Sequence, residues 1–289
     1  MLKDNLRVLI MCCDGLYQRY LINRVKKEFN LVGVIFHATP NAKGNLFKRI
    51  ARYRNPIDLL TYLQARILIP YYESLALPLV KRLFFENGCA PLPPNSVPIC
   101  HVGNVNAPEA VKFVHDLAPD IICVNGTNLL REPMLNLIPT IPFGIINLHT
   151  GLSPYARGGN CNLFVLLEGH PELVGITIHH IDKGIDSGDI IITARPEMEP
   201  TDNYEMIDAK TFRLGIDLML VAIHQLIEGR AERVKQWEEG RLFLRRTGYV
   251  YYPYLRVKVN LLLKKGLIRD YLKNRQIRDI GIQLVGKQV

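Results

Sequence analysis

Three polar side chains of different chemistry lie in the middle of the chain, within residues 147–186. Asn147 and His149 are two residues apart, and Asp186 follows further on in a glycine-containing segment. Transfer of an acyl group to an amine passes through a tetrahedral adduct, whose oxygen becomes an anion while the attacking nitrogen loses a proton. An amide donor, an imidazole and a carboxylate meet both needs. The sequence therefore indicates acyl transfer as one chemistry open to this chain.

Each of the three residues has a role that follows from its chemistry. Asn147 is expected to donate an amide N–H to the oxyanion, and loss of such a donor costs roughly a hundredfold or more in rate. His149, two positions along a strand, projects from the same face and donates or relays a proton. Asp186 favours the protonated imidazole and holds a water that accepts the proton of the amine. No covalent intermediate is required, and Ser153 lacks the Gly-x-Ser-x-Gly setting of a serine hydrolase.

Taken alone, these residues have simpler explanations. An Asn or a His at a strand end is commonly a loop hydrogen-bonder, and an Asp among glycines is commonly a turn former. His179 and His180 are adjacent, so they should face opposite sides of a strand, one toward the core and one toward solvent. Catalysis by the Cys161 thiol is disfavoured, because no helix start or basic neighbour that would lower its pKa is evident.

The elements that must position these residues follow from the hydrophobic pattern. Continuous apolar runs predict strands at 6–11, 31–36, 97–102, 120–124 and 143–148, with helices at about 16–29 and 108–117. This order predicts an α/β fold, a doubly wound, mostly parallel Rossmann-like sheet with helices on both faces. Ligands of such sheets bind outside the carboxyl ends of the strands. The segments 12–15, 125–128 and 147–149 are therefore expected at one edge.

The second half of the core continues with two strands and a long helix. The runs 175–181 and 189–194 read as strands, and the loop 182–188 between them carries Asp186. A helix from about Asn203 to Glu228 follows, with Asp202 and Glu205 as a capping box and Gly229 as the C-cap.

Two segments interrupt or extend this core. A helix-prone insertion at about 39–95 is expected to pack against the main sheet, with a lid, a partner surface or a membrane-surface helix pair as alternatives. We predict a catalytic domain at 1–229, including the insertion, and a short basic, aromatic carboxyl-terminal extension at 230–289. The tyrosines of the extension would either stack on a base or sugar or form a small packed hairpin. These are Tyr249, Tyr251, Tyr252 and Tyr254.

The net charge of +9 is concentrated in the same two segments. Residues 43–82 contain eight Lys or Arg against two acidic residues, and residues 241–278 contain eleven against one. Such surface attracts nucleic acid, phosphorylated molecules or anionic membranes, or is simply a solvated face. The six scattered cysteines read as reduced thiols, and no metal site is expected. With no long apolar run and no signal peptide, a cytoplasmic location is expected.

Four strings together are specific enough to indicate a family. They are Ala118–Ile122, Ile145–Gly159, Gly175–His179 and Asp186–Ile191. The chain resembles the folate-dependent formyltransferases over about 97–228, and more loosely over 1–36. That family includes glycinamide ribonucleotide formyltransferase, methionyl-tRNA formyltransferase and the sugar N-formyltransferases of polysaccharide biosynthesis. The resemblance implies 10-formyltetrahydrofolate as the formyl donor, no metal, and catalytic roles for Asn147, His149 and Asp186.

The resemblance also implies where the donor binds. The pterin would lie between the loop 125–130 and the loop 181–186, held mostly by backbone groups. The implied cofactor-binding residues are Asn125, Gly126, Leu129, Leu130, Ile181 and Asp182.

The carboxyl-terminal tail indicates which acceptor to expect. Its short tail is similar to those of the sugar N-formyltransferases, so we expect transfer to a primary amine, the amino group of a nucleotide-linked amino sugar. A methionyl-tRNA formyltransferase-like enzyme is the alternative; the β-barrel of that enzyme does not fit the residues after Gly229, which disfavours tRNA as a partner. A second alternative is an inactive relative that binds nucleic acid or an anionic membrane. A homodimer and peripheral membrane contact are left open.

Overall fold

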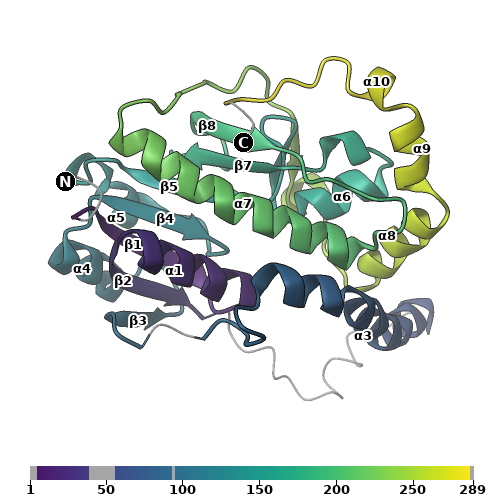
Figure 1. Ribbon diagram of the computed structural model, residues 1–289, viewed down its shortest axis with the longest axis horizontal. Coiled ribbons are helices and arrows are strands. Elements are labelled where there is room, and N and C mark those ends of the chain that lie inside the picture. Colours follow the sequence, from purple (N-terminus) through teal and green to yellow (C-terminus); the bar gives the residue numbers. More distant parts are fainter. Residues whose placement is uncertain (1–4, 39–55, 93–94, 287–289) are drawn as a thin grey trace.

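The computed structural model describes residues 5–38, 56–92 and 95–286 (Figure 1). A seven-stranded sheet in the order β3-β2-β1-β4-β5-β7-β8 forms its centre. The strands are β1 (Arg7–Cys13), β2 (Asn30–His37), β3 (Ile99–Val102), β4 (Ile121–Asn125), β5 (Ile145–His149), β7 (Ile176–His180) and β8 (Ile190–Ala194). The first five are parallel to one another, whereas β7 runs antiparallel to both β5 and β8. The predicted doubly wound, mostly parallel sheet is confirmed.

Helices cover both faces of this sheet. Alternate residues of β1 enter two different cores: Ile10 packs in the core that α1 (Leu16–Glu28) and α7 (Tyr204–Ile227) cover, and Met11 in the core under α4 (Pro108–Leu117). A strand buried on both faces needs apolar residues at consecutive positions, which explains the unbroken runs in the sequence. Short helices complete the connections: α5 (Glu132–Leu135), η1 (Ile138–Thr140) and η2 (Pro171–Leu173).

The start of α7 differs from the prediction by one residue. The side chain of Asn203 accepts a hydrogen bond from the backbone N–H of Met206, so Asn203 is the N-cap. Asp202 is unable to cap because its carboxylate accepts from the N–H of Glu199 and pairs with Lys210 at 2.7 Å. The predicted capping box is therefore wrong, although the helix itself lies where it was expected.

The insertion contributes one long helix, α3 (Pro56–Phe84), which includes Pro70 and Pro78. It packs chiefly on α7 and on α8 (Tyr254–Lys264), rather than on the sheet as expected. In Figure 1 it runs along the lower right edge of the molecule. The earlier part of the predicted insertion, 39–55, lies outside the described residues. In the described ranges, no helix is both long and apolar enough to cross a membrane.

The carboxyl-terminal extension forms a second hydrophobic core with the middle of the chain. Its strand β9 (Arg241–Phe243) pairs with β6 (Ala156–Gly158), and Phe243 stacks on Phe164 of α6 (Cys161–Leu167) at 5.4 Å. Tyr249 lies edge-on to Phe243 and so packs in this core, but β9 pairs in parallel with β6 and does not form the hairpin that one alternative expected. The remaining elements of the extension are η3 (Arg245–Thr247), α9 (Leu267–Lys273) and α10 (Arg275–Arg278). The boundary at 229 stays a prediction, but the two parts share one core.

Candidate active site

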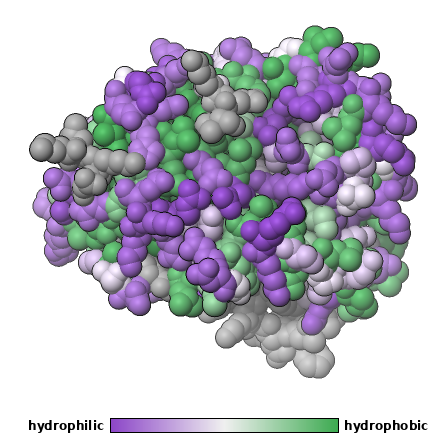
Figure 2. Space-filling view, viewed as in Figure 1, coloured by the Kyte–Doolittle hydropathy of each residue, from purple (hydrophilic) through white to green (hydrophobic). Residues whose placement is uncertain are grey.

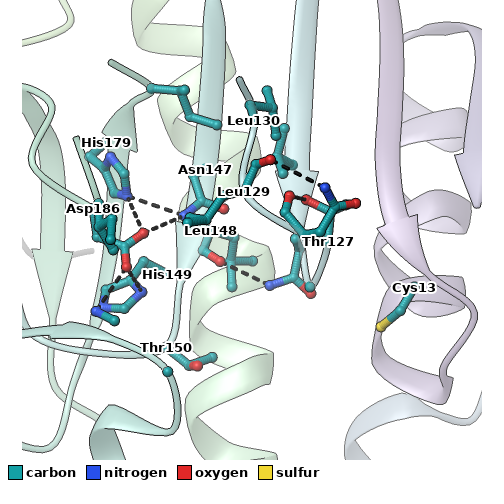
Figure 3. A pocket seen from close by; sticks show the side chains of 18 of the residues that line it. Cys13, Thr127, Leu129, Leu130, Asn147, Leu148, His149, Thr150, His179 and Asp186 are labelled. Atoms are coloured by element: carbon teal, nitrogen blue, oxygen red, sulfur yellow. Dashed lines mark hydrogen bonds and ion pairs between the residues drawn. The ribbon is translucent and has the colours of Figure 1, made fainter. Parts of the chain in front are cut away.

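Strand β5 presents Asn147 and His149 on one face (Figure 3). Leu148, between them, is buried in the opposite core, as the two-residue period of a strand requires. The parallel arrangement of β4 and β5 places the loop that follows Asn125 beside them. The predicted convergence at the carboxyl edge of the sheet is therefore present.

Asp186 reaches the same place from the loop between β7 and β8. It adopts a left-handed conformation with φ of 47°, and the side chain of Gln236 donates to its carbonyl at 2.7 Å. Its carboxylate accepts from Asn147 Nδ2 at 3.3 Å and from the backbone N–H of Gly158 at 2.9 Å, and lies 3.5 Å from His149 Nδ1. The structure brings together all three residues that the sequence singled out.

A fourth residue, His179, belongs to this cluster and was missed. It lies opposite Asn147 in the antiparallel pair of β5 and β7, with its Nε2 atom 3.2 Å from Asn147 Nδ2 and 3.5 Å from the Asp186 carboxylate. Its Nδ1 atom faces the carbonyl of His180 at 2.8 Å, so a neutral ring donates there and accepts from Asn147. His179 thereby orients the Asn147 amide toward Asp186.

The expected division between the two adjacent histidines is only half right. His179 is buried, but in the candidate site, and His180 is partly buried, with burial lowering its pKa to about 4.

The pKa values of Asp186 and His149 are shifted so that the carboxylate is ionised and the imidazole is neutral. Burial alone would raise the pKa of Asp186, but His149, His179 and the Gly158 N–H hold it well below its usual range. Burial lowers the pKa of His149, against the opposing effect of Asp186. At neutral pH the site thus holds a carboxylate beside an uncharged imidazole.

The surroundings of the His149 ring suit the uptake of a proton. Its Nε2 atom lies 3.1 Å from the carbonyl oxygen of Ala156, and its Nδ1 atom faces the carboxylate of Asp186. Both ring nitrogens therefore have an oxygen acceptor within reach when both carry hydrogen. A proton that His149 accepts is stabilised on the ring by these two partners.

Cys161 stands at the start of α6, 3.6 Å from His149 Nε2. The expectation that no helix start lay near this thiol is wrong. Burial and the charge of Asp186 nevertheless raise its pKa well above the usual value, so the sulfur stays protonated. Cys161 therefore remains disfavoured as a nucleophile, although it lies at the start of a helix.

A cavity of about 460 Å³ opens beside the cluster, and its walls include the loops 125–130 and 181–186. All six residues predicted to bind the cofactor line it: Asn125, Gly126, Leu129, Leu130, Ile181 and Asp182. The amide of Asn125 is already engaged, because it accepts from Gln18 at 2.6 Å and donates to the carbonyl of Leu148 at 2.9 Å. Its side chain thus links the end of β4 to α1 and β5, and contact of these residues with a pterin stays a prediction.

A second cavity, of about 580 Å³, adjoins the first, and the two share Thr150, Asn160 and Phe212 in their walls. The insertion, α7 and the extension supply most of its polar side chains, α1 adds Tyr17, and only Tyr251 among them was singled out from the sequence as a candidate ligand contact. The polar side chains are Tyr17, Glu73, Tyr204, Glu205, Asp208, Tyr251 and Arg256.

Charge in the second cavity is arranged around Arg256. Its guanidinium lies 2.9 Å from both Glu73 and Glu205, so it joins α3, α7 and α8 in one network. Asp208 stands apart, and in the described part of the chain its carboxyl has no hydrogen-bond or ion-pair partner. Burial raises its pKa to about 7, against the opposing effect of Arg256. An unpartnered carboxyl in a cavity is suited to meet a polar ligand.

No group of three or more His, Cys, Asp or Glu side chains in the ranges 5–38, 56–92 and 95–286 has the geometry of a metal site.

Comparison with known proteins matches residues 100–223 to the family model described as formyl transferase. This segment belongs to the formyl transferase family. It contains β5 and the loop of Asp186, so the matched region includes the whole cluster around Asn147 and His149. For this segment, the family predicted from the sequence strings is confirmed.

Relatives extend the likeness beyond this segment. A methionyl-tRNA formyltransferase of Akkermansia muciniphila is 30% identical over 207 residues, which is 71% of this chain and 61% of that protein. A methionyl-tRNA formyltransferase of Geotalea daltonii is 29% identical over 49% of this chain and 45% of its own length. The chain thus spans about half to three fifths of the relatives it matches.

Solved structures share the fold over most of this chain. A sugar N-formyltransferase from a Shewanella species has a TM-score of 0.52 at 16% identity, covering 89% of this chain and 87% of that one. Glycinamide ribonucleotide transformylase 1 from Symbiobacterium toebii has a TM-score of 0.51 at 18% identity, over 80% of this chain and 95% of that one.

Proposed function

We propose that this protein transfers a formyl group from 10-formyltetrahydrofolate to a primary amine. The observation that carries the proposal is the meeting of Asn147, neutral His149 and ionised Asp186 at the wall of a cavity, within the segment that belongs to the formyl transferase family. An oxyanion donor and a proton acceptor side by side are what formyl transfer to an amine requires.

The reaction follows from the positions of these groups. The amine attacks the formyl carbon, and the Asn147 amide, which lies 3.3 Å from Asp186, donates an N–H to the oxygen that becomes anionic. His149 accepts the proton of the amine, and the Asp186 carboxylate stabilises the imidazolium. Collapse of the adduct breaks the bond to the folate nitrogen, which takes up a proton as tetrahydrofolate leaves.

The donor fits the first cavity. Its walls combine apolar side chains of Leu129, Leu130 and Ile181 with the polar loop groups around Asp182, a mixture suited to a flat heteroaromatic ring with polar edges. The donor supplies the activated formyl carbon, and the two loops hold it against β5. Isothermal titration calorimetry with a non-reactive folate measures binding at this site without requiring turnover.

For the acceptor, we infer an amino sugar attached to a nucleotide. Carboxylates and tyrosines line the second cavity. Carboxylates hydrogen-bond to the hydroxyl groups of a sugar, and tyrosine rings stack on its ring. The second cavity reaches the first through Thr150 and Asn160, so an amine could enter from there. Structures titled sugar N-formyltransferase are among those with the same fold, which supports this choice.

A second candidate is an amine carried by tRNA. The relatives named methionyl-tRNA formyltransferase and the basic extension favour it. Phosphate contacts from exposed Lys and Arg would then make binding strongly dependent on salt.

One experiment tests both candidates. The protein is incubated with 10-formyltetrahydrofolate and, in separate reactions, a panel of nucleotide-linked amino sugars and methionyl-tRNA, while release of tetrahydrofolate is followed. We expect turnover with an amino sugar, and a rate lower by about a hundredfold or more in the Asn147→Ala variant. Turnover with methionyl-tRNA alone would replace the sugar as acceptor. No turnover with any amine, together with salt-sensitive RNA binding, would identify an inactive relative and overturn the proposal.

A further inference from the structure

Helix α3 carries a stripe of large apolar side chains on its outer side. The exposed members are Leu60, Leu63, Ile67, Tyr71 and Leu75. Their spacing of three or four residues aligns them along one side of the helix. The buried residues of the same helix, Ala65, Ala76 and Phe84, fall on the opposite side. The stripe therefore faces away from the protein that α3 packs against.

This pattern is unlike that of an ordinary surface helix, which turns polar residues outward. A helix that is apolar on both sides is built to be covered on both sides. The inner side of α3 packs on α7 and α8. Figure 2 shows apolar surface at the lower right edge, where Figure 1 places α3. A contiguous exposed stripe of this kind marks an interaction surface.

The charges around the stripe indicate what covers it. Arg66, Lys81 and Arg82 of α3 are exposed, and the neighbouring α8 adds exposed Lys258 and Lys264. Of the two acidic residues in the sequence of α3, Glu73 is paired with Arg256. Exposed large apolar side chains together with exposed Lys and Arg are the composition of a helix that lies in the surface of an anionic membrane.

The sequence that precedes α3 is basic as well. Residues 43–54 contain five Lys or Arg and no Asp or Glu. Each basic residue near an anionic bilayer adds to the attraction, which weakens as salt is added.

We propose that the outer side of α3 docks the protein on an anionic lipid bilayer, with the stripe from Leu60 to Leu75 inserted among the lipid headgroups. The helix lies in the plane of the membrane surface, and the basic residues beside it contact the acidic headgroups. This inference does not depend on the proposed reaction, since it concerns a surface outside the two cavities.

The test compares two isoleucines of nearly equal exposure. Ile67, on the stripe, is 73% exposed, and Ile277, on α10, is 71% exposed. The full chain and the variants Ile67→Glu and Ile277→Glu are sedimented with phosphatidylcholine vesicles that contain phosphatidylglycerol, or with phosphatidylcholine alone. We expect the parent to bind the anionic vesicles, Ile67→Glu to bind about tenfold more weakly, and Ile277→Glu to bind as the parent does.

Three outcomes would overturn the proposal. The parent fails to bind anionic vesicles, or it binds both lipids alike without any effect of salt, or Ile67→Glu binds as well as Ile277→Glu. The alternative occupant of the stripe is a second copy of the chain, and light scattering in the absence of lipid measures the molar mass that tests it. A dimer that only Ile67→Glu dissociates would assign the stripe to a second copy and also overturn the proposal. Circular dichroism of both variants establishes that each is folded.

Discussion

The two adjoining cavities differ in how their polar groups are partnered. In the first, Asn147, His149, His179 and Asp186 contact one another, and loops at the edge of the sheet fix them. In the second, helices from the insertion and the extension form much of the wall, and the carboxyl of Asp208 has no partner among the described residues. The sheet therefore supplies preorganised groups for the reaction, whereas the added segments supply a surface suited to recognising an acceptor.

The unpartnered carboxyl of Asp208 also affects the stability of the native state. Raising the pKa of Asp208 from 3.8 to about 7 disfavours the native state at neutral pH. An Asn at this position would avoid that cost. Retention of a destabilising carboxyl is typical of binding sites, where stability and activity conflict.

The largest expected effect comes from breaking the first cavity's cluster. Asp186→Asn keeps the size of the side chain but removes the charge beside His149, and we expect kcat to fall by about a thousandfold. Steady-state rates of tetrahydrofolate release measure this, with Asp116→Asn on the exposed surface of α4 as the matched control. If Asn147→Ala, His149→Ala and Asp186→Ala each retained activity within a few fold of the parent, the assigned roles would be wrong.

The next test asks whether the extension is an integral part of the molecule. Phe243 is 1% exposed and stacks on Phe164, so Phe243→Ala should lower the free energy of unfolding by about 3 kcal/mol. Urea denaturation measures the loss, and Ile277→Ala on the surface should change it by less than about 0.5 kcal/mol. A loss that small at Phe243 would mean that the extension is only loosely attached.

Asp208→Asn should sharpen the contrast by changing stability and binding in opposite directions. The carboxyl has a raised pKa in the native state, so its cost grows as pH rises from about 4 to 7 and then stays constant. We expect the variant to be more stable than the parent by about 2 kcal/mol at pH 8, and by less at pH 5.

In the same variant the KM for the amine acceptor should rise about tenfold with kcat little changed, because a ligand contact is lost outside the reacting groups. Glu199→Gln, an exposed substitution near the start of α7, is the control for both measurements. An unchanged KM would remove Asp208 from the acceptor site, and an unchanged stability would contradict its raised pKa.

The smallest effect expected is in the pH dependence. Because burial lowers the pKa of His149 below 6.5, the neutral, proton-accepting ring persists to lower pH than in a free histidine. The rate should therefore stay level down to about pH 6.5 and decline only below it. A decline in kcat centred above pH 6.5 would exclude neutral His149 as the base.

Sequence reasoning reached the sheet and three of the four clustered residues for identifiable reasons. Buried parallel strands leave unbroken apolar runs, and Asn147 and His149 share a strand at a spacing of two. His179 escaped because its place opposite Asn147 depends on the register between β5 and β7, which no local pattern reveals. The signal available was that β7 neighbours the Asp186 loop and could return beside β5.

The second cavity was out of reach for a similar reason. Glu73, Asp208 and Arg256 are far apart in the sequence, and each resembles an ordinary charge on a helix surface. Only the packing of α3 and α8 on α7 brings them together. The cytoplasmic location and the homodimer stay predictions.

The pairing of β6 with β9 limits how this protein can be re-engineered. Gly158 of β6 donates its backbone N–H to the Asp186 carboxylate, and the same residue lies opposite Phe243 of β9. Gln236 supports the Asp186 loop from the extension as well. A chimera that exchanged only the extension, in order to change the acceptor, would disturb a donor of the catalytic carboxylate. The smallest unit that can be transplanted intact contains β6, Gln236 and β9 together.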